Sequence, residues 1–148
     1  SFAEFCNYPN EIIDQIFLGN ATQVKDKEIL KTLKITHVLN TAEEVEICKE
    51  ELSKAIPMDF FCNHIFLDSI GVQYSKLPIK DFQDFDISEF FQEAYKNISD
   101  IIKEDPKNNI LVHCARGMSR SVAIVAMYLM KKNKWSYRKV NIDVIIVD

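Results

Sequence analysis

The sequence predicts an α/β domain with a largely parallel sheet, because short apolar runs alternate with longer amphipathic segments. The clearest short run, residues 110–112, contains only Ile, Leu and Val and predicts a buried strand. The clearest amphipathic segment precedes it, with apolar residues at helical spacing from 87 to 102. A chain of 148 residues has the length of one domain with a sizeable core. We therefore expect a single domain over residues 1–148.

The first half of the chain contains three regular elements and two ambiguous segments. Residues 11–19 predict one or two short strands. Residues 25–34 carry their apolar side chains on one helical face, and residues 35–39 predict the next strand. Residues 43–54 are charged with a weak helical stripe, which leaves a helix and a solvated loop both open. Residues 60–67 are aromatic and β-prone.

The second half begins with a strand over residues 74–79, where Pro78 favours a strand end or a sheet edge. An acidic loop, residues 81–86, follows. Asp86 and Glu89 have the spacing of a capping box, which predicts that the long amphipathic helix begins there. Its apolar stripe is core packing.

The segment 113–121 joins the buried strand to a helix predicted over residues 121–132, which is apolar nearly all round and therefore buried. Unpaired N–H groups at a helix N-terminus bind tetrahedral oxyanions, and Gly117 can adopt the backbone angles of such a loop. Arg120 offers a planar fork that matches two phosphate oxygens. The same groups would stabilise a thiolate on Cys114, the form that attacks phosphorus. The sequence thus predicts a nucleophilic sulfur inside an oxyanion-binding loop.

The pattern His113-Cys114-x-x-Gly117-x-x-Arg120-Ser121 resembles the signature of the cysteine-based protein phosphatases. The residues between Cys114 and Arg120, Ala-Arg-Gly-Met-Ser, are similar to those of the small, atypical dual-specificity branch. The resemblance implies a mixed, three-layer sheet flanked by helices, and hydrolysis of phosphotyrosine and phosphoserine/threonine in protein substrates through a phosphocysteine. It also implies a phosphate-binding loop made of Ala115, Arg116, Gly117, Met118, Ser119 and Arg120.

A phosphocysteine mechanism needs a carboxyl group that protonates the leaving oxygen and later activates water. The acidic loop supplies candidates. Asp81 follows the predicted strand directly, and the resemblance places the general acid there. Asp84 ranks second and Asp68 third, whereas Asp86 is better explained as the helix cap.

Three further residues receive roles from the resemblance. Ser121, which also suits a helix cap, would hydrogen-bond the Cys114 sulfur and help it leave in the second step. His113 would orient the loop and tune the thiolate by hydrogen bonding. Asn40 would brace the same loop. Lysines typical of phosphoinositide-directed relatives are absent from residues 115–119, which disfavours a lipid substrate.

Composition excludes several other classes. A net charge of −4 argues against nucleic-acid binding, and no apolar stretch reaches the roughly 18–20 residues of a membrane span. His37, His64 and His113 lack metal-ligand spacing, so we expect neither a metal nor a cofactor. Four cysteines without CxxC pairing, one of them reactive, fit a reducing cytoplasm or nucleus.

The C-terminal end departs from the family pattern, because the chain ends in the β-branched run 144–147 where another helix is expected. A missing helix would expose apolar surface, and we expect self-association through this end. Three other functions stay open: a rhodanese-like sulfurtransferase or arsenate reductase, a catalytically inactive phosphate-binding module, and a cysteine amidase that would use His37 or His64.

Overall fold

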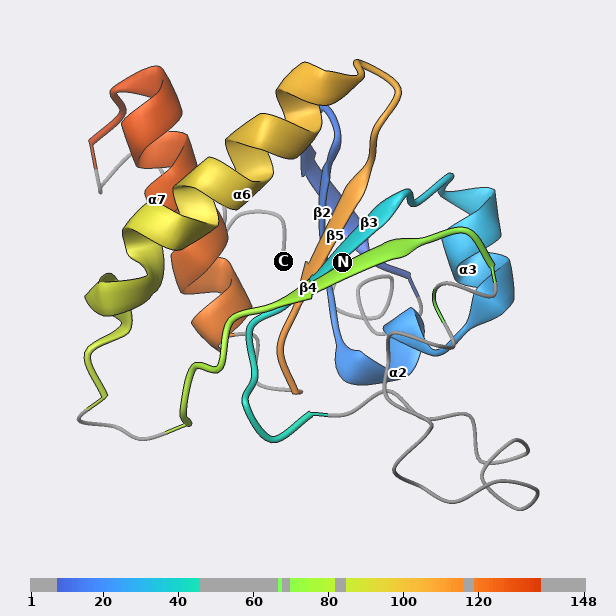
Figure 1. Ribbon diagram of the computed structural model, residues 1–148, viewed down its shortest axis with the longest axis horizontal. Helices are drawn as coiled ribbons and strands as arrows, with labels where there is room; N and C mark the ends of the chain where they lie inside the picture. Colours follow the sequence, from blue (N-terminus) through green and yellow to red (C-terminus); the bar gives the residue numbers. More distant parts are fainter. Residues whose placement is uncertain (1–7, 46–66, 68–69, 82–84, 116–118, 137–148) are drawn as a thin grey trace.

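The computed structural model describes residues 8–45, 67, 70–81, 85–115 and 119–136. Within them a five-stranded sheet has the order β1-β2-β5-β3-β4 (Figure 1). Its strands are β1 (Asn10–Ile13), β2 (Ile16–Gly19), β3 (His37–Asn40), β4 (Gln73–Lys76) and β5 (Ile110–His113). Only β1 runs antiparallel to its neighbour, and β5 lies in the centre. The predicted largely parallel, mixed sheet is confirmed.

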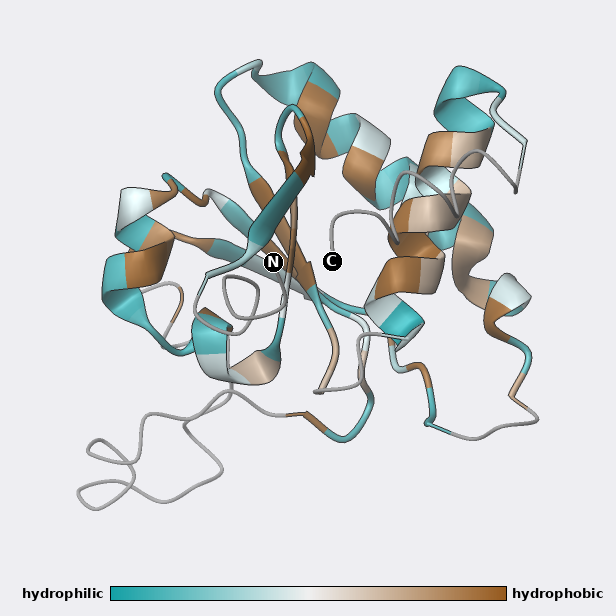
Figure 2. Cartoon of the chain, turned by 180° about the vertical axis from the view of Figure 1, so that it is seen from behind, coloured by the Kyte–Doolittle hydropathy of each residue, from teal (hydrophilic) through white to brown (hydrophobic). Residues whose placement is uncertain are grey.

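Helices cover both faces of this sheet (Figure 1). They are α2 (Ala21–Val24), α3 (Lys27–Thr32), the 3-10 helix η2 (Ile87–Phe90), α6 (Phe91–Glu104) and α7 (Ser119–Asn133). Consecutive strand residues point to opposite faces. On β5, Ile110 and Val112 pack with α6 and α7, whereas Leu111 packs with α2 and α3. Two cores on one sheet make the predicted three-layer α/β architecture. In Figure 2 hydrophobic residues, coloured brown, occur along the central strands and on the helices that cover them.

The helix expected over residues 25–34 is α3, Lys27–Thr32, and a second short helix, α2, precedes it. Asn20 caps α2, where its side chain accepts from the Gln23 N–H in a complete capping box. Asp26 then caps α3 by accepting from the Glu28 and Ile29 N–H groups. The predicted helix therefore begins at Lys27, directly after its cap.

The helix expected from residue 87 begins with the tighter turn η2 and continues as α6. Asp86 is its cap, as predicted, although its side chain accepts from the Ser88 N–H rather than from a box with Glu89. Ala94, Ile98 and Ile101 form the buried stripe of α6. The predicted core role of this stripe is confirmed.

Two element boundaries differ from the expectation. β4 ends at Lys76 rather than residue 79, just before Leu77 and Pro78. α7 begins at Ser119, two residues earlier than expected, and none of its residues from 120 to 130 is exposed.

Some predicted segments lie outside the described residues: 46–54, 60–66 and 137–148. The last of these contains the run expected to mediate self-association. None of the helices in the described part of the chain has the length and apolar character needed to cross a membrane.

Candidate active site

The site lies where the parallel strands end. In the register of the sheet, His113 at the end of β5 stands beside Gly19 of β2 and Asn40 of β3. Carboxyl ends of parallel strands are the usual place for ligands in open α/β sheets. Cys114 follows β5 at this edge and is 2% exposed.

The sulfur of Cys114 has a hydroxyl neighbour. Ser121 Oγ lies 3.3 Å from Cys114 Sγ, within hydrogen-bond distance for sulfur. Ser121 sits in the first turn of α7 and is fully buried. The structure therefore brings the predicted nucleophile and its predicted hydroxyl partner together, seven residues apart in the chain.

The buried ring of His113 contacts the backbone next to this sulfur. Its Nδ1 lies 3.0 Å from the Cys114 carbonyl oxygen, and a carbonyl only accepts, so Nδ1 carries the hydrogen. Burial lowers the pKa of His113 to about 4, so the ring is neutral at pH 7. Its Nε2 has no hydrogen-bond partner among the residues that the structure describes. The His113 ring is therefore hydrogen-bonded to the backbone of Cys114, the predicted nucleophile.

Arg120 lies in the same turn of α7 as Ser121 and points to the segment that follows β3. Its NH1 group donates to Glu44 Oε2 at 2.7 Å and to the Ile79 carbonyl oxygen at 2.8 Å. NH2 donates to the other Glu44 oxygen. A guanidinium has five N–H groups, and among the residues that the structure describes none accepts a hydrogen bond from Nε or from the second hydrogen of NH2, which share one edge. The hydrogen bonds from Glu44 raise the pKa of Arg120 above its usual value.

Glu44 is a site residue that the sequence analysis missed. Hydrogen bonds from Arg120 lower its pKa to about 2, so the carboxylate stays charged at any physiological pH. A usable signal existed: Glu44 stands four residues after the end of β3, at the edge where Cys114 follows β5. The weak helical stripe over residues 43–54 left only a helix or a solvated loop as interpretations, so Glu44 was not singled out.

Asn40 holds the segment that carries Glu44. Its side chain accepts from the Ala42 N–H at 2.8 Å and donates to the Val45 carbonyl at 2.9 Å and to the Tyr74 hydroxyl at 3.1 Å. Asn40 was expected to brace the Cys114 loop. Its side-chain contacts go instead to the segment that follows it and to Tyr74 of β4.

Two other residues connect neighbouring segments to the Cys114 loop. Thr41 donates from its hydroxyl and from its backbone N–H to the His113 carbonyl, both at 2.8 Å. On the other side, the Ala21 N–H donates to the Ala115 carbonyl at 3.2 Å. Thr41 was not singled out in the sequence, because a buried threonine next to a strand carries no distinctive pattern.

Asp81 lies close to Arg120. Its Oδ2 is 3.9 Å from Arg120 NH2, and its side chain is 73% exposed. Both residues line a shallow cavity of about 290 Å³ whose apolar wall includes Phe85, Ile87 and Ala123. The first-ranked candidate acid is therefore next to Arg120, the residue predicted to bind phosphate. Asp84 and Asp68 lie outside the described residues.

The loop itself is described only at its two ends. Ala115 follows Cys114, and Ser119 is exposed at the start of α7. Arg116, Gly117 and Met118 lie outside the described residues. Within the described part of the chain, no three His, Cys, Asp or Glu side chains come together in a way that could hold a metal ion.

This arrangement was compared with known proteins. Residues 16–143 match the family "Dual specificity phosphatase, catalytic domain". Dual specificity protein phosphatase 1B of Arabidopsis thaliana is 33% identical over 130 residues, which cover 88% of this chain and 65% of the relative. Human dual specificity protein phosphatase 26 is 31% identical over 125 residues, covering 84% of this chain and 52% of the relative.

Solved structures give the same result. The crystal structure of DUSP15 superimposes with a TM-score of 0.70 at 25% identity, over 90% of this chain and 72% of that one. Human DUSP28 superimposes with a TM-score of 0.68 at 20% identity, over 92% of this chain and 78% of that one, which shows the shared fold. The chain spans about half to two thirds of the length of the two curated relatives above. With most of its length matched to the catalytic-domain family, the chain belongs to the dual-specificity phosphatase family.

Proposed function

We propose that this chain is a single catalytic domain that hydrolyses phosphotyrosine and phosphoserine/threonine in protein substrates through a phosphocysteine. One observation carries the proposal. At one edge of the sheet Cys114 lies beside Ser121, and the Arg120 guanidinium lies beside Asp81. Those four groups supply a nucleophile, a hydroxyl donor, an anion-binding fork and an acid.

The first step is attack of the Cys114 thiolate on the substrate phosphorus, with cleavage of the bond to the ester oxygen. Arg120 would bind two phosphate oxygens through the Nε and NH2 edge that Glu44 leaves open. Glu44 supports this role because it fixes the guanidinium plane from the opposite edge. Positioning of that kind lowers the entropic cost of reaching the transition state.

Asp81 would donate its proton to the departing oxygen in this first step. Its exposed side chain, 3.9 Å from Arg120, borders the open cavity through which a substrate would enter. Aryl phosphates should react faster than alkyl phosphates, because phenoxide is the better leaving group. A shallow pocket would allow both phosphotyrosine and phosphoserine/threonine to reach Cys114.

In the second step water attacks the phosphocysteine, and Asp81, now ionised, accepts a proton from it. The Cys114 sulfur leaves as a thiolate. Ser121 Oγ, 3.3 Å from Sγ, is placed to donate a hydrogen bond to that developing charge. His113 supports the same step indirectly by fixing the Cys114 carbonyl.

The testing experiment is hydrolysis of p-nitrophenyl phosphate across pH, with and without vanadate, by the wild type, Cys114→Ser and Asp81→Asn. We expect metal-independent turnover that vanadate inhibits, that Cys114→Ser abolishes and that Asp81→Asn reduces. Turnover unaffected by Asp81→Asn would move the acid to Asp84. No turnover by reduced wild-type protein would contradict the proposal and favour a phosphate-binding module or a sulfur-transfer enzyme.

We also expect that no nucleic acid, membrane, metal or cofactor takes part, and that the protein works in the cytoplasm or nucleus. Self-association through the C-terminal end remains a prediction. Analytical ultracentrifugation at high concentration tests it, and a monomer throughout would contradict it.

A further inference from the structure

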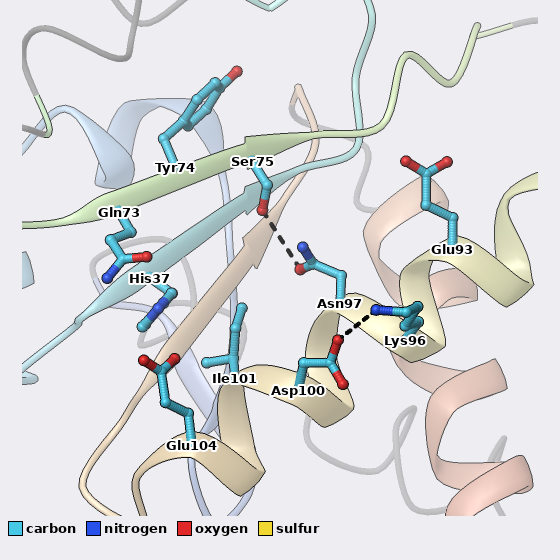
Figure 3. A pocket seen from close by; sticks show the side chains of 10 residues that line it. All are labelled: His37, Gln73, Tyr74, Ser75, Glu93, Lys96, Asn97, Asp100, Ile101 and Glu104. Carbon is cyan, nitrogen blue, oxygen red and sulfur yellow. Dashed lines mark hydrogen bonds and ion pairs between the residues drawn. The ribbon is translucent and has the colours of Figure 1, made fainter.

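A second cavity, of about 420 Å³, lies between β4 and α6 (Figure 3). It is lined by one face of α6 and by the starts of β3 and β4. Glu104 and His37 lie near one end and Glu93 lies near the other. None of the groups assigned to catalysis lines it. We call this cavity the β4–α6 groove.

The charge of the groove is negative. Three carboxylates line it, from Glu93, Asp100 and Glu104, against one ammonium group, that of Lys96. Lys96 is already paired with Asp100 at 2.8 Å. Among the described residues, Glu93 and Glu104 have no cationic side chain bound to them, so two negative charges remain uncompensated.

His37 provides an independent indication of a ligand. The side chain lines the groove yet His37 is only 6% exposed, and its Nε2 has no hydrogen-bond partner within the described residues. Buried polar atoms without a partner are uncommon in folded proteins.

Hydrogen bonding at Thr36 determines which partner Nε2 needs. Thr36 Oγ1 donates its single hydrogen to the Asn109 carbonyl and accepts from the Asn109 N–H. The 2.8 Å contact with His37 Nδ1 therefore requires Nδ1 to be the donor. Burial lowers the pKa of His37, so the ring is neutral at pH 7 and Nε2 keeps a lone pair. It needs a hydrogen-bond donor.

The length of the groove defines the size of the ligand. Glu93 and Glu104 are eleven residues apart on α6, which corresponds to roughly 16 Å of helix. An extended peptide covers that distance in about five residues. A ligand with cationic donors at both ends satisfies both carboxylates and brings an N–H group to the His37 end.

We propose that the β4–α6 groove docks an extended basic segment of a protein partner, with two arginines about five positions apart. Guanidinium groups supply both the positive charge and the N–H donors that the groove lacks. The Ser75 hydroxyl donates to Asn97 Oδ1 at 3.4 Å between β4 and α6, so the segment lies over this hydrogen bond (Figure 3). There the side-chain amides of Gln73 and Asn97 offer polar contacts to a backbone. The β4–α6 groove is separate from the Cys114 loop, so binding of the segment there does not require catalytic turnover.

The test uses a fluorescein-labelled peptide, acetyl-Arg-Ala-Ala-Ala-Ala-Arg-amide, and a control peptide with citrulline in place of both arginines. Citrulline keeps the shape and removes the charge. Binding is measured by fluorescence anisotropy at low salt. We expect the double variant Glu93→Gln/Glu104→Gln to weaken arginine-peptide binding by about fivefold or more, because each exposed charge pair contributes modestly.

Glu11→Gln is the matched control, because Glu11 is an exposed carboxylate on β1, at the far edge of the sheet from β4. It should leave the dissociation constant within about twofold of the wild type. A long-range ¹H–¹⁵N spectrum should also show the His37 Nε2 resonance moving when the arginine peptide binds.

Three outcomes would overturn the inference. Equal weakening by Glu11→Gln would show diffuse attraction rather than a site. Equal affinity for the citrulline peptide and the arginine peptide would show that charge does not contribute to binding. Binding of spermine with no binding of the arginine peptide would make the groove a small polyamine site instead.

Discussion

Glu44 and Arg120, 76 residues apart in the chain, form a two-pronged ion pair at the carboxyl edge of the sheet. The pair joins the segment after β3 to the first turn of α7. The pair uses one edge of the guanidinium, and in the proposed mechanism the other edge binds the phosphate. We therefore expect Glu44 to orient Arg120 rather than to compete with the substrate.

Glu44→Gln should therefore weaken phosphate binding while leaving the fold intact. We expect vanadate affinity and kcat/KM for p-nitrophenyl phosphate to fall on the order of tenfold, because the guanidinium is no longer fixed. Isothermal titration with vanadate measures the first quantity. Glu43→Gln, an exposed neighbour, is the matched control and should change neither. Identical behaviour of the two variants would contradict the positioning role.

The pair also shows where sequence reasoning succeeds and where it stops. The strands β2, β3 and β5 could be predicted, because their apolar runs are strong and local. The site around Cys114 could be predicted because its residues lie within eight positions of one another. The pairing of Glu44 with Arg120 could not be predicted, since the two residues are distant in the chain and the surroundings of Glu44 have no clear period; only the position of Glu44 after a strand indicated its place at this edge.

Some helix boundaries were predicted wrongly, because local hydrogen bonds of polar side chains override the periodicity of the apolar residues. The helix predicted from residue 25 begins at Lys27 after its cap Asp26, and the Asp86 carboxylate accepts from the N–H and hydroxyl of Ser88 instead of forming the predicted box with Glu89. Polar side chains form hydrogen bonds to nearby backbone groups and so determine where a helix begins. A count of apolar positions does not detect this effect.

Asn40 should matter as much for the site as for stability. Asn40→Ala removes the side-chain bonds to Ala42, Val45 and Tyr74, and we expect a loss of about 2 kcal/mol in the free energy of unfolding. The segment bearing Glu44 would lose its support, so vanadate affinity should also fall. Tyr74→Phe removes one of the bonds and should have a smaller effect on both. Urea denaturation and titration measure the two effects.

A double-mutant cycle separates these contributions. If Asn40 acts on phosphate binding through Glu44, the double variant Asn40→Ala/Glu44→Gln should bind vanadate about as weakly as Glu44→Gln alone. Fully additive losses would instead assign Asn40 a purely structural role.

Ser121→Ala should slow the second chemical step more than the first. The Ser121 hydroxyl lies 3.3 Å from Cys114 Sγ and would stabilise the departing thiolate, so its loss makes hydrolysis of the phosphocysteine limiting. We expect kcat to fall on the order of tenfold or more, together with a burst of p-nitrophenolate in stopped-flow traces. A fall in kcat with no burst would place the effect in the first step.

Stability should depend on pH through His113. Burial lowers its pKa in the folded protein to about 4, against about 6.5 in the unfolded chain, so only the unfolded chain binds a proton between these values. This contribution is complete above pH 6.5 and is lost as the pH falls towards 4. It amounts to about 2 kcal/mol between pH 7.5 and pH 5.

Urea denaturation of the wild type and of His113→Gln at both pH values isolates this contribution. His37 also has a lowered pKa, but it is present in both proteins and cancels in the difference. Glutamine can still donate to the Cys114 carbonyl, which preserves the backbone contact that Nδ1 makes. The variant should therefore lose less stability than the wild type on acidification, by about 2 kcal/mol. Parallel losses in the two proteins would show that the His113 ring is not held neutral by burial.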